Sequence, residues 1–194
     1  MKQLLVFIML IMAMSVFAGP LGFEKGMTLE QLQTIDPEMY LADNSETIWI
    51  MTKAPQATSA FDIFLVNIHP EIGLFSVRLI SKDINCGAFG EGLVTEYNRL
   101  KELLTNNYGP ASNFIDNINR GSIWSDARYY MMSLLQKDRK LLAIWTDKAA
   151  MPADLDCVLI EAAALSSTVG YIYIQYYMEG HDEILDSLNA TGNI

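Results

Sequence analysis

The chain has 194 residues, 51% of them hydrophobic, and its 23 acidic and 13 basic residues give a formal net charge of −10. The apolar content is too high for a disordered chain, and the length suits one domain with a full core or two small fused units. Because an acidic surface repels phosphate backbones and no Lys/Arg cluster offsets this repulsion, the composition argues against nucleic acid as a partner.

The first eighteen residues have the pattern of a cleavable secretory signal peptide. A positive charge precedes the wholly apolar stretch Leu4–Met14, and Val16 and Ala18 occupy positions −3 and −1 of a signal-peptidase site. The alternative is a permanent anchor, but this apolar run is shorter than the roughly 20 residues that span a bilayer. No cysteine stands at the cleavage site to receive a lipid. We therefore expect residues 1–18 to be removed, and residues 19–194 to be released as a soluble periplasmic or secreted protein without a stable membrane anchor.

The first half of the remaining chain predicts one helix followed by three strands. Thr28 and Gln31 have the spacing of a capping box at the start of a short amphipathic helix. Asp36-Pro37 ends this helix, because the residue before a proline avoids the helical conformation. Runs of β-branched, aromatic or alternating apolar residues then predict three strands, the last two joined as a hairpin: 47–52, 61–68 and 74–81.

The second half begins in the same way. Apolar residues recur at helical spacing from Leu93 to Tyr108, and Gly109-Pro110 ends the helix. Ile123-Trp124 predicts a short strand, and Asp126 is placed to cap a further short helix. Three more strands are predicted after it: 141–146, 155–160 and 171–178.

The order of these elements predicts an α+β fold. Hairpins with short turns favour antiparallel sheet with helices packed on one face, and the lack of alternating βαβ units argues against a parallel dinucleotide-binding sheet. Residues 23–84 and 91–178 are candidates for two degenerate α-β-β-β units. Since no Pro/Ser-rich linker separates them, we expect residues 19–194 to form a single compact domain.

One short motif resembles a known family. The segment Gly26-Met27-Thr28-Leu29-Glu30-Gln31-Leu32 resembles the opening of the SmpA/OmlA family of outer-membrane assembly lipoproteins, in which a Gly-Met-Thr turn caps a helix packed on a three-stranded antiparallel sheet. Tyr108-Gly109-Pro110 is similar to that family's helix stop, but it follows the second helix, and the family's lipidated cysteine is missing. A tandem of such units also resembles the secreted β-lactamase inhibitor proteins, which bind an enzyme through a concave sheet. Both resemblances imply a protein-binding module, and neither transfers functional residues to this chain.

No residue combination predicts a catalytic, metal or cofactor site. His69 stands in a hairpin turn, and His181-Asp182-Glu183 indicates the solvated start of a C-terminal helix rather than a metal site. The glycine-rich segment 86–92 lacks the phosphate-binding lysine and is expected to be a flexible strand-to-helix connection. Glu161, in an apolar stretch, supports the alternative of a periplasmic hydrolase that uses carboxylate acid–base chemistry.

Cys86 and Cys157 are the two cysteines of the chain. In an oxidising compartment an even number of cysteines favours a disulfide. This bond would close a loop of about 70 residues, worth roughly 4 kcal/mol in the chain-entropy model. Two buried free thiols are the alternative.

The tyrosines of the last predicted strand are the candidate interaction residues. Tyr171, Tyr173 and Tyr177 alternate with Ile172 and Ile174, so they share one face of that strand. If the isoleucines face the core, the tyrosines form an exposed row of a kind enriched in protein interfaces. The other placement, which the sequence favours, buries the tyrosines beneath helices. We expect a non-catalytic binding protein whose partner is another envelope or extracellular protein.

Overall fold

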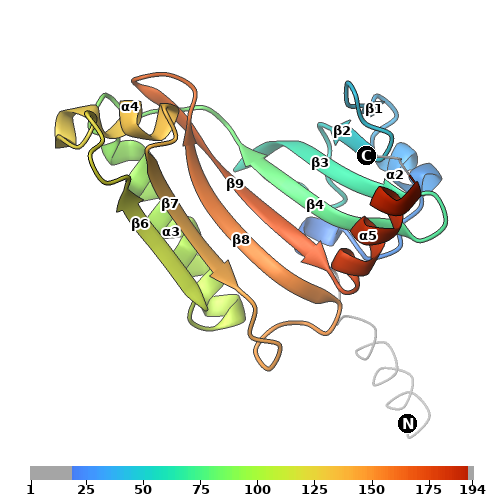
Figure 1. The fold of residues 1–194 in the computed structure, drawn as a ribbon. Helices are drawn as coiled ribbons and strands as arrows, with labels where there is room; N and C mark the ends of the chain where they lie inside the picture. Colours follow the sequence, from blue (N-terminus) through green and yellow to red (C-terminus); the bar gives the residue numbers. More distant parts are fainter. Residues whose placement is uncertain (1–18, 192–194) are drawn as a thin grey trace, which may run out of the picture.

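The structure is a computed structural model that describes residues 19–191, so the predicted signal peptide lies outside the described residues. Within them, nine strands form one sheet in the order β1-β2-β3-β4-β9-β8-β7-β6, with β5 also paired to β9 (Figure 1). Every pairing is antiparallel, which confirms the predicted α+β class. The strands are β1 (Tyr40–Leu41), β2 (Ile48–Met51), β3 (Phe61–His69), β4 (Gly73–Ser81), β5 (Ile84–Asn85), β6 (Asn113–Ile118), β7 (Arg139–Trp145), β8 (Leu155–Ala164) and β9 (Val169–Met178).

The helices are mostly short, and α3 is the longest. They are the 3₁₀ turns η1 (Pro20–Gly22) and η2 (Ala127–Tyr129) and the α-helices α2 (Leu29–Ile35), α3 (Glu91–Tyr108), α4 (Tyr130–Leu135) and α5 (His181–Thr191). None of the helices described between residues 19 and 191 has the length and apolar character needed to cross a membrane.

The start of α2 forms as the sequence predicts. The Thr28 hydroxyl accepts the Gln31 N–H at 3.3 Å, and the Gln31 side-chain oxygen accepts the Thr28 N–H at 2.8 Å. Just before this cap, the Gly26 N–H donates to the Leu74 carbonyl at 2.8 Å. The approach is so close that a Cβ at Gly73, whose φ is +82°, would lie 2.4 Å from the Gly26 oxygen. The capped motif is therefore held against the start of β4.

The hydrophobic core lies between the sheet and α3. Side chains on this face of the sheet line up across β4, β9, β8 and β7, as in the row Leu79, Ile174, Ile160 and Ala143. All four are buried. The matching stripe on α3, spaced three or four residues apart, is also buried: Leu93, Tyr97, Leu100 and Leu104.

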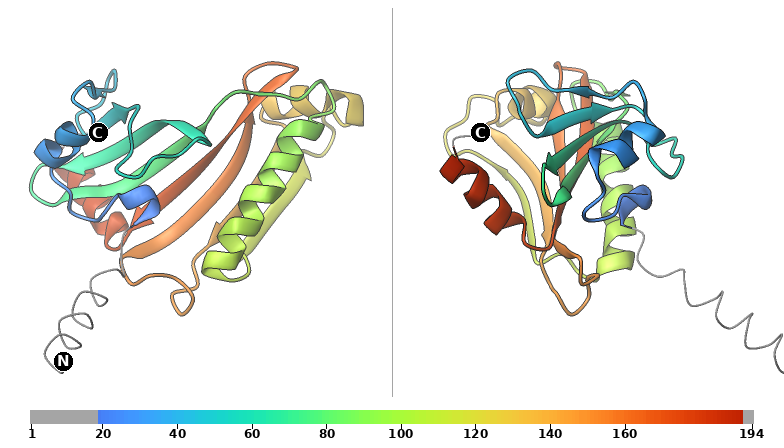
Figure 2. Two further views of the ribbon diagram at one scale, coloured as in Figure 1. Left: turned by 180° about the vertical axis from the view of Figure 1, so that it is seen from behind. Right: turned by 90° about the vertical axis from the view of Figure 1, so that its right-hand side faces the viewer.

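The helices do not all lie on one face of the sheet. The side view in Figure 2 shows α2, η1 and α3 on one side and α5 on the other. Phe75 and Ile184 form a small second cluster between β4 and α5, apart from the main core. The prediction of helices on one face therefore holds for α2 and α3, whereas α5 covers one end of the opposite face.

The prediction of a strand at Ile123-Trp124 is wrong. These residues belong to a loop, where Ile123 is 79% exposed, and the strand after α3 is β6, which pairs with β7. Asn113–Ile118 forms the edge of the sheet and is mostly exposed, so it carries little of the apolar alternation that reveals a strand. Within the described residues, no strand pairs with the outer side of β6.

Candidate functional site: the open face of the sheet

The sheet face opposite α3 carries its own rows of side chains. In one row Arg78, Gln175, Leu159 and Ile144 are neighbours across β4, β9, β8 and β7. In the next row Ile80, Tyr173, Glu161 and Leu142 are neighbours across the same strands. Alternation along each strand places these residues away from the core. We call this surface the open face; it consists of Ile63, Leu65, Arg78, Ile80, Leu142, Ile144, Leu159, Glu161, Tyr171, Tyr173 and Gln175, of which Leu142 and Gln175 are buried by their neighbours.

The structure places the predicted tyrosines on this side of the sheet. Ile172 and Ile174 are buried in the core, whereas Tyr171 and Tyr173 are half-buried on the open face. The placement that the sequence favoured, with the tyrosines under helices, is therefore wrong for these two. The reason is that α3 packs on the isoleucine side of β9.

Tyr177 has different surroundings from the other two tyrosines. Its ring meets the His181 ring edge-on, with centroids 4.3 Å apart, and His181 also contacts Phe75 with centroids 5.6 Å apart. The first turn of α5 thus covers Tyr177. His181 begins α5 as the sequence indicates, but it is buried between these rings rather than solvated.

Polar contacts connect the centre of the open face. The Arg78 guanidinium lies 4.7 Å from the centroid of the Tyr173 ring, and its Nε donates to Gln175 Oε1 at 2.7 Å. The Tyr173 hydroxyl donates to Glu161 Oε2 at 2.5 Å. Tyr171 lies beside Tyr173 with ring centroids 6.5 Å apart. A cation, two phenols and a carboxylate are therefore held in fixed positions among aliphatic side chains.

The surroundings of Tyr173 fix the protonation state of its phenol. Burial, and then the neighbouring Glu161 carboxylate, raise the pKa of Tyr173 far above its usual value. The phenol therefore stays protonated at neutral pH and acts as a hydrogen-bond donor. Glu161, the residue proposed for a hydrolase, is hydrogen-bonded by this phenol rather than by a second carboxyl group.

A hollow of about 580 Å³ adjoins the open face at the start of α5, lined by Thr146, Asp156, Cys157, Tyr177, His181, Asp182 and Glu183. Burial, and then the carboxylates of Asp156 and Asp182, raise the pKa of the Cys157 thiol, so it is a weak nucleophile. Among residues 19–191, no group of three or more His, Cys, Asp or Glu side chains is arranged to hold a metal ion.

The predicted disulfide is not formed, and both cysteines are free thiols. The Cys86 N–H donates to the Thr168 carbonyl just before β9 begins, whereas Cys157 is paired with Tyr177 near the end of β9. The intervening length of strand is roughly 25 Å, and a disulfide requires Cα atoms within about 7 Å. The two thiols also lie on different faces, since Cys86 packs against the core and Cys157 lines the hollow beside α5.

Sequence reasoning missed the role of Arg78. Its place between the apolar residues Val77 and Leu79 indicated that it faces away from the core. Its contact with Tyr173 depends on the pairing of β4 with β9, which are about 95 residues apart in sequence. No local signal specifies that pairing.

Comparison of the chain with protein-family models, with curated protein sequences and with solved structures finds no match.

Proposed function

We propose that the chain is an exported, non-catalytic binding protein that contacts another envelope or extracellular protein through the open face. The observation that carries this proposal is the group formed by Tyr171, Tyr173 and Arg78, half-buried among aliphatic side chains on the sheet face opposite α3. Tyrosine and arginine are the residue types most often found at the energetic centres of protein interfaces. The signal-peptide pattern of residues 1–18 supports a periplasmic or secreted location.

The arrangement of these side chains reduces the cost of binding. Arg78 is held by the Tyr173 ring and by Gln175, and Tyr173 is held by Glu161. Side chains that are ordered before binding lose less conformational entropy when a partner arrives. The net charge of −10 also favours encounter with a partner that presents a basic surface.

Site-specific cross-linking tests where the partner binds. A photoreactive phenylalanine analogue at Tyr171 is expected to form a covalent adduct with one protein in envelope or culture extract, identified by mass spectrometry. The same analogue at Tyr129 is the control, because Tyr129 lies outside the open face and has a similar degree of burial. An adduct from position 129 but not from position 171 would contradict the proposal.

A matched pair of double variants tests the energetic contribution of the open face. In Arg78→Ala/Tyr173→Ala the stacked pair is removed from the open face. In Arg128→Ala/Tyr129→Ala a second stacked pair, with the guanidinium 5.1 Å from the ring centroid, is removed from η2, just before α4. Loss of a hot-spot pair is expected to weaken binding to the cross-linked partner by tenfold or more, about 1.4 kcal/mol or above. The η2 variant is expected to bind like the parent. Equal affinities for the two variants, with both folded by circular dichroism, would remove the open face as the binding site.

A further inference from the structure

A largely apolar cavity lies on the other side of the sheet, between α3 and η1. Its volume is about 470 Å³, which is within the usual range of roughly 300–1,000 Å³ for ligand pockets. Figure 2 shows α3 and η1 on the same side of the sheet. Its walls come from α3, η1, β3, β4, β8 and β9, and the main apolar residues are Leu21, Phe61, Leu79, Leu100, Leu104 and Ile174.

The tyrosines of this cavity are neutral. Tyr176 is 6% exposed and lines the cavity together with Tyr108. Burial raises the pKa of both phenols, so neither carries a charge at neutral pH. They therefore contribute ring surface to the cavity without adding a charge.

Asp154 is the one charged side chain among the described residues that line the cavity. It lines the cavity together with Asn107 and is only partly exposed. Within the described residues, its carboxylate takes part in no ion pair and no side-chain hydrogen bond. Asp156, two residues later, is instead paired with Lys148. A carboxylate without a side-chain partner among the described residues therefore lines a largely apolar space.

We propose that this cavity binds a hydrophobic amine, a small amphiphile whose apolar chain enters between α3 and the sheet and whose ammonium group meets Asp154. The charge of the carboxylate selects against an anionic head group, and the net charge of −10 acts in the same direction. Leu103, 49% exposed on α3, lies at the cavity and would cover part of the apolar chain. The site is on the opposite side of the sheet from the open face and is independent of the protein partner proposed above.

Three probes with the same chain and different head groups test this proposal: decylamine, decanol and decanoate. Isothermal titration below the micelle concentration is expected to give binding in the order amine, alcohol, carboxylate. The amine is expected to bind about tenfold more tightly than the alcohol at low salt, and this preference is expected to shrink as ionic strength rises. Binding of decanoate as tight as that of decylamine, or no binding of any probe, would overturn the proposal.

Variants distinguish binding in this cavity from nonspecific adsorption to exposed apolar surface. Asp154→Asn is expected to reduce decylamine affinity to that of decanol while leaving decanol binding unchanged, which also shows that the cavity is intact. Leu103→Asp is expected to weaken decanol binding, whereas Leu165→Asp is not, although Leu165 is similarly exposed at 53% and belongs to the β8–β9 turn. If Leu165→Asp weakened decanol binding as much as Leu103→Asp, or if Asp154→Asn kept the preference for the amine, the proposal would be wrong.

Discussion

At the level of single residues, Asp36 is a buried carboxylate that accepts several backbone hydrogen bonds. Its side chain is 1% exposed, and it accepts backbone N–H groups from Thr52 at 2.7 Å, Lys53 at 3.1 Å and Glu38 at 3.3 Å. Burial opposes ionisation of this carboxyl group, but the hydrogen bonds outweigh it and lower the pKa of Asp36 below its usual value. Asp36 thereby joins the end of α2 to the end of β2.

The Asp36→Asn variant is expected to be less stable than the parent by about 2 kcal/mol at pH 7, because the amide replaces one accepting oxygen with a donor. A carboxyl group with a lowered pKa stabilises the fold above its unfolded pKa of about 4, and this contribution is lost as pH falls through the folded pKa. The difference between parent and variant should therefore narrow at pH 3. Urea unfolding at both pH values measures it, and a difference that widened in acid would refute this account of Asp36.

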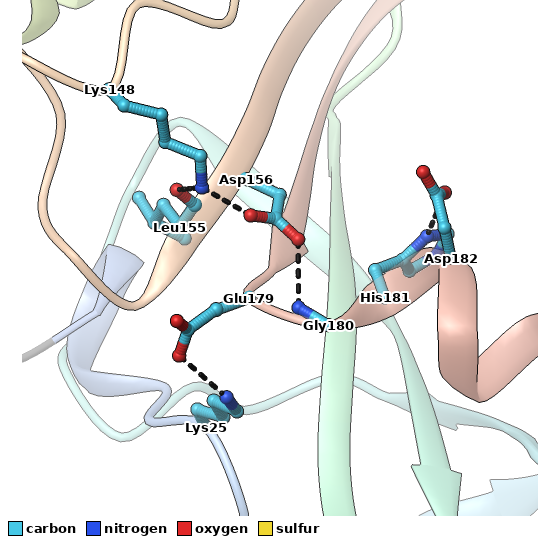
Figure 3. A network of polar contacts seen from close by, with 8 residues as sticks. All are labelled: Lys25, Lys148, Leu155, Asp156, Glu179, Gly180, His181 and Asp182. Carbon is cyan, nitrogen blue, oxygen red and sulfur yellow. Dashed lines mark hydrogen bonds and ion pairs between the residues drawn. The ribbon is translucent and has the colours of Figure 1, made fainter.

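Among the elements, α5 depends on a polar network at its first turn (Figure 3). The Asp156 carboxylate accepts the Gly180 N–H at 2.8 Å and pairs with Lys148. Glu179, the residue before Gly180, forms an ion pair with Lys25 at 3.0 Å. The first-turn residue His181 then packs on Tyr177 and Phe75. A few contacts at one end therefore position the helix that limits the open face.

Removal of the Asp156 carboxylate is expected to release α5 rather than unfold the sheet. Asp156→Ala should lower stability by about 1 kcal/mol, comparable to loss of a helix cap. It should speed amide hydrogen exchange in residues 181–191 and leave exchange in β8 and β9 unchanged. Asp186→Ala, which removes an exposed carboxylate from the same helix, is the control. Faster exchange throughout the sheet would show that α5 and the sheet unfold together.

Elements with strong local signals are those that the sequence predicts. The capping box at Thr28, the apolar stripe of α3 and the alternating strands β3 and β4 are confirmed because each depends on neighbours within a few residues. β6 was missed because an exposed edge strand needs no apolar face. For the open face, the alternation of residue types along the strand correctly grouped Tyr171 with Tyr173. It does not indicate which side of β9 the helices cover, because that depends on tertiary packing.

At the level of the whole molecule, one sheet runs through both halves of the sequence. β4, from the first half, pairs with β9, from the second, over residues 76–80 and 173–177. The core residues of both halves belong to one cluster that includes Phe64, Val77, Ile160 and Ile174. The hydrophobic core of each half is therefore completed by residues of the other half.

Unfolding is therefore expected to be a single cooperative transition. Calorimetry should give one peak, and the midpoints from far-ultraviolet circular dichroism and from tryptophan fluorescence should coincide. The fluorescence samples both halves, since Trp49 lies in β2 and Trp145 in β7. Two separated transitions would show that residues 23–84 and 91–178 are independent folding units.

The unpaired side of β6 has a consequence for behaviour at high concentration. An exposed strand edge offers free backbone groups to a second copy of the chain and can seed aggregation. Here Asn113, Asp116 and Asn117 interrupt the apolar residues of the edge, and Asp116 is held by Arg139 at 3.0 Å. Edge-to-edge growth would have to bring these polar groups, and a second Asp116, into a shared sheet. The polar residues that make β6 hard to recognise in the sequence are thus the same residues that oppose edge-to-edge pairing.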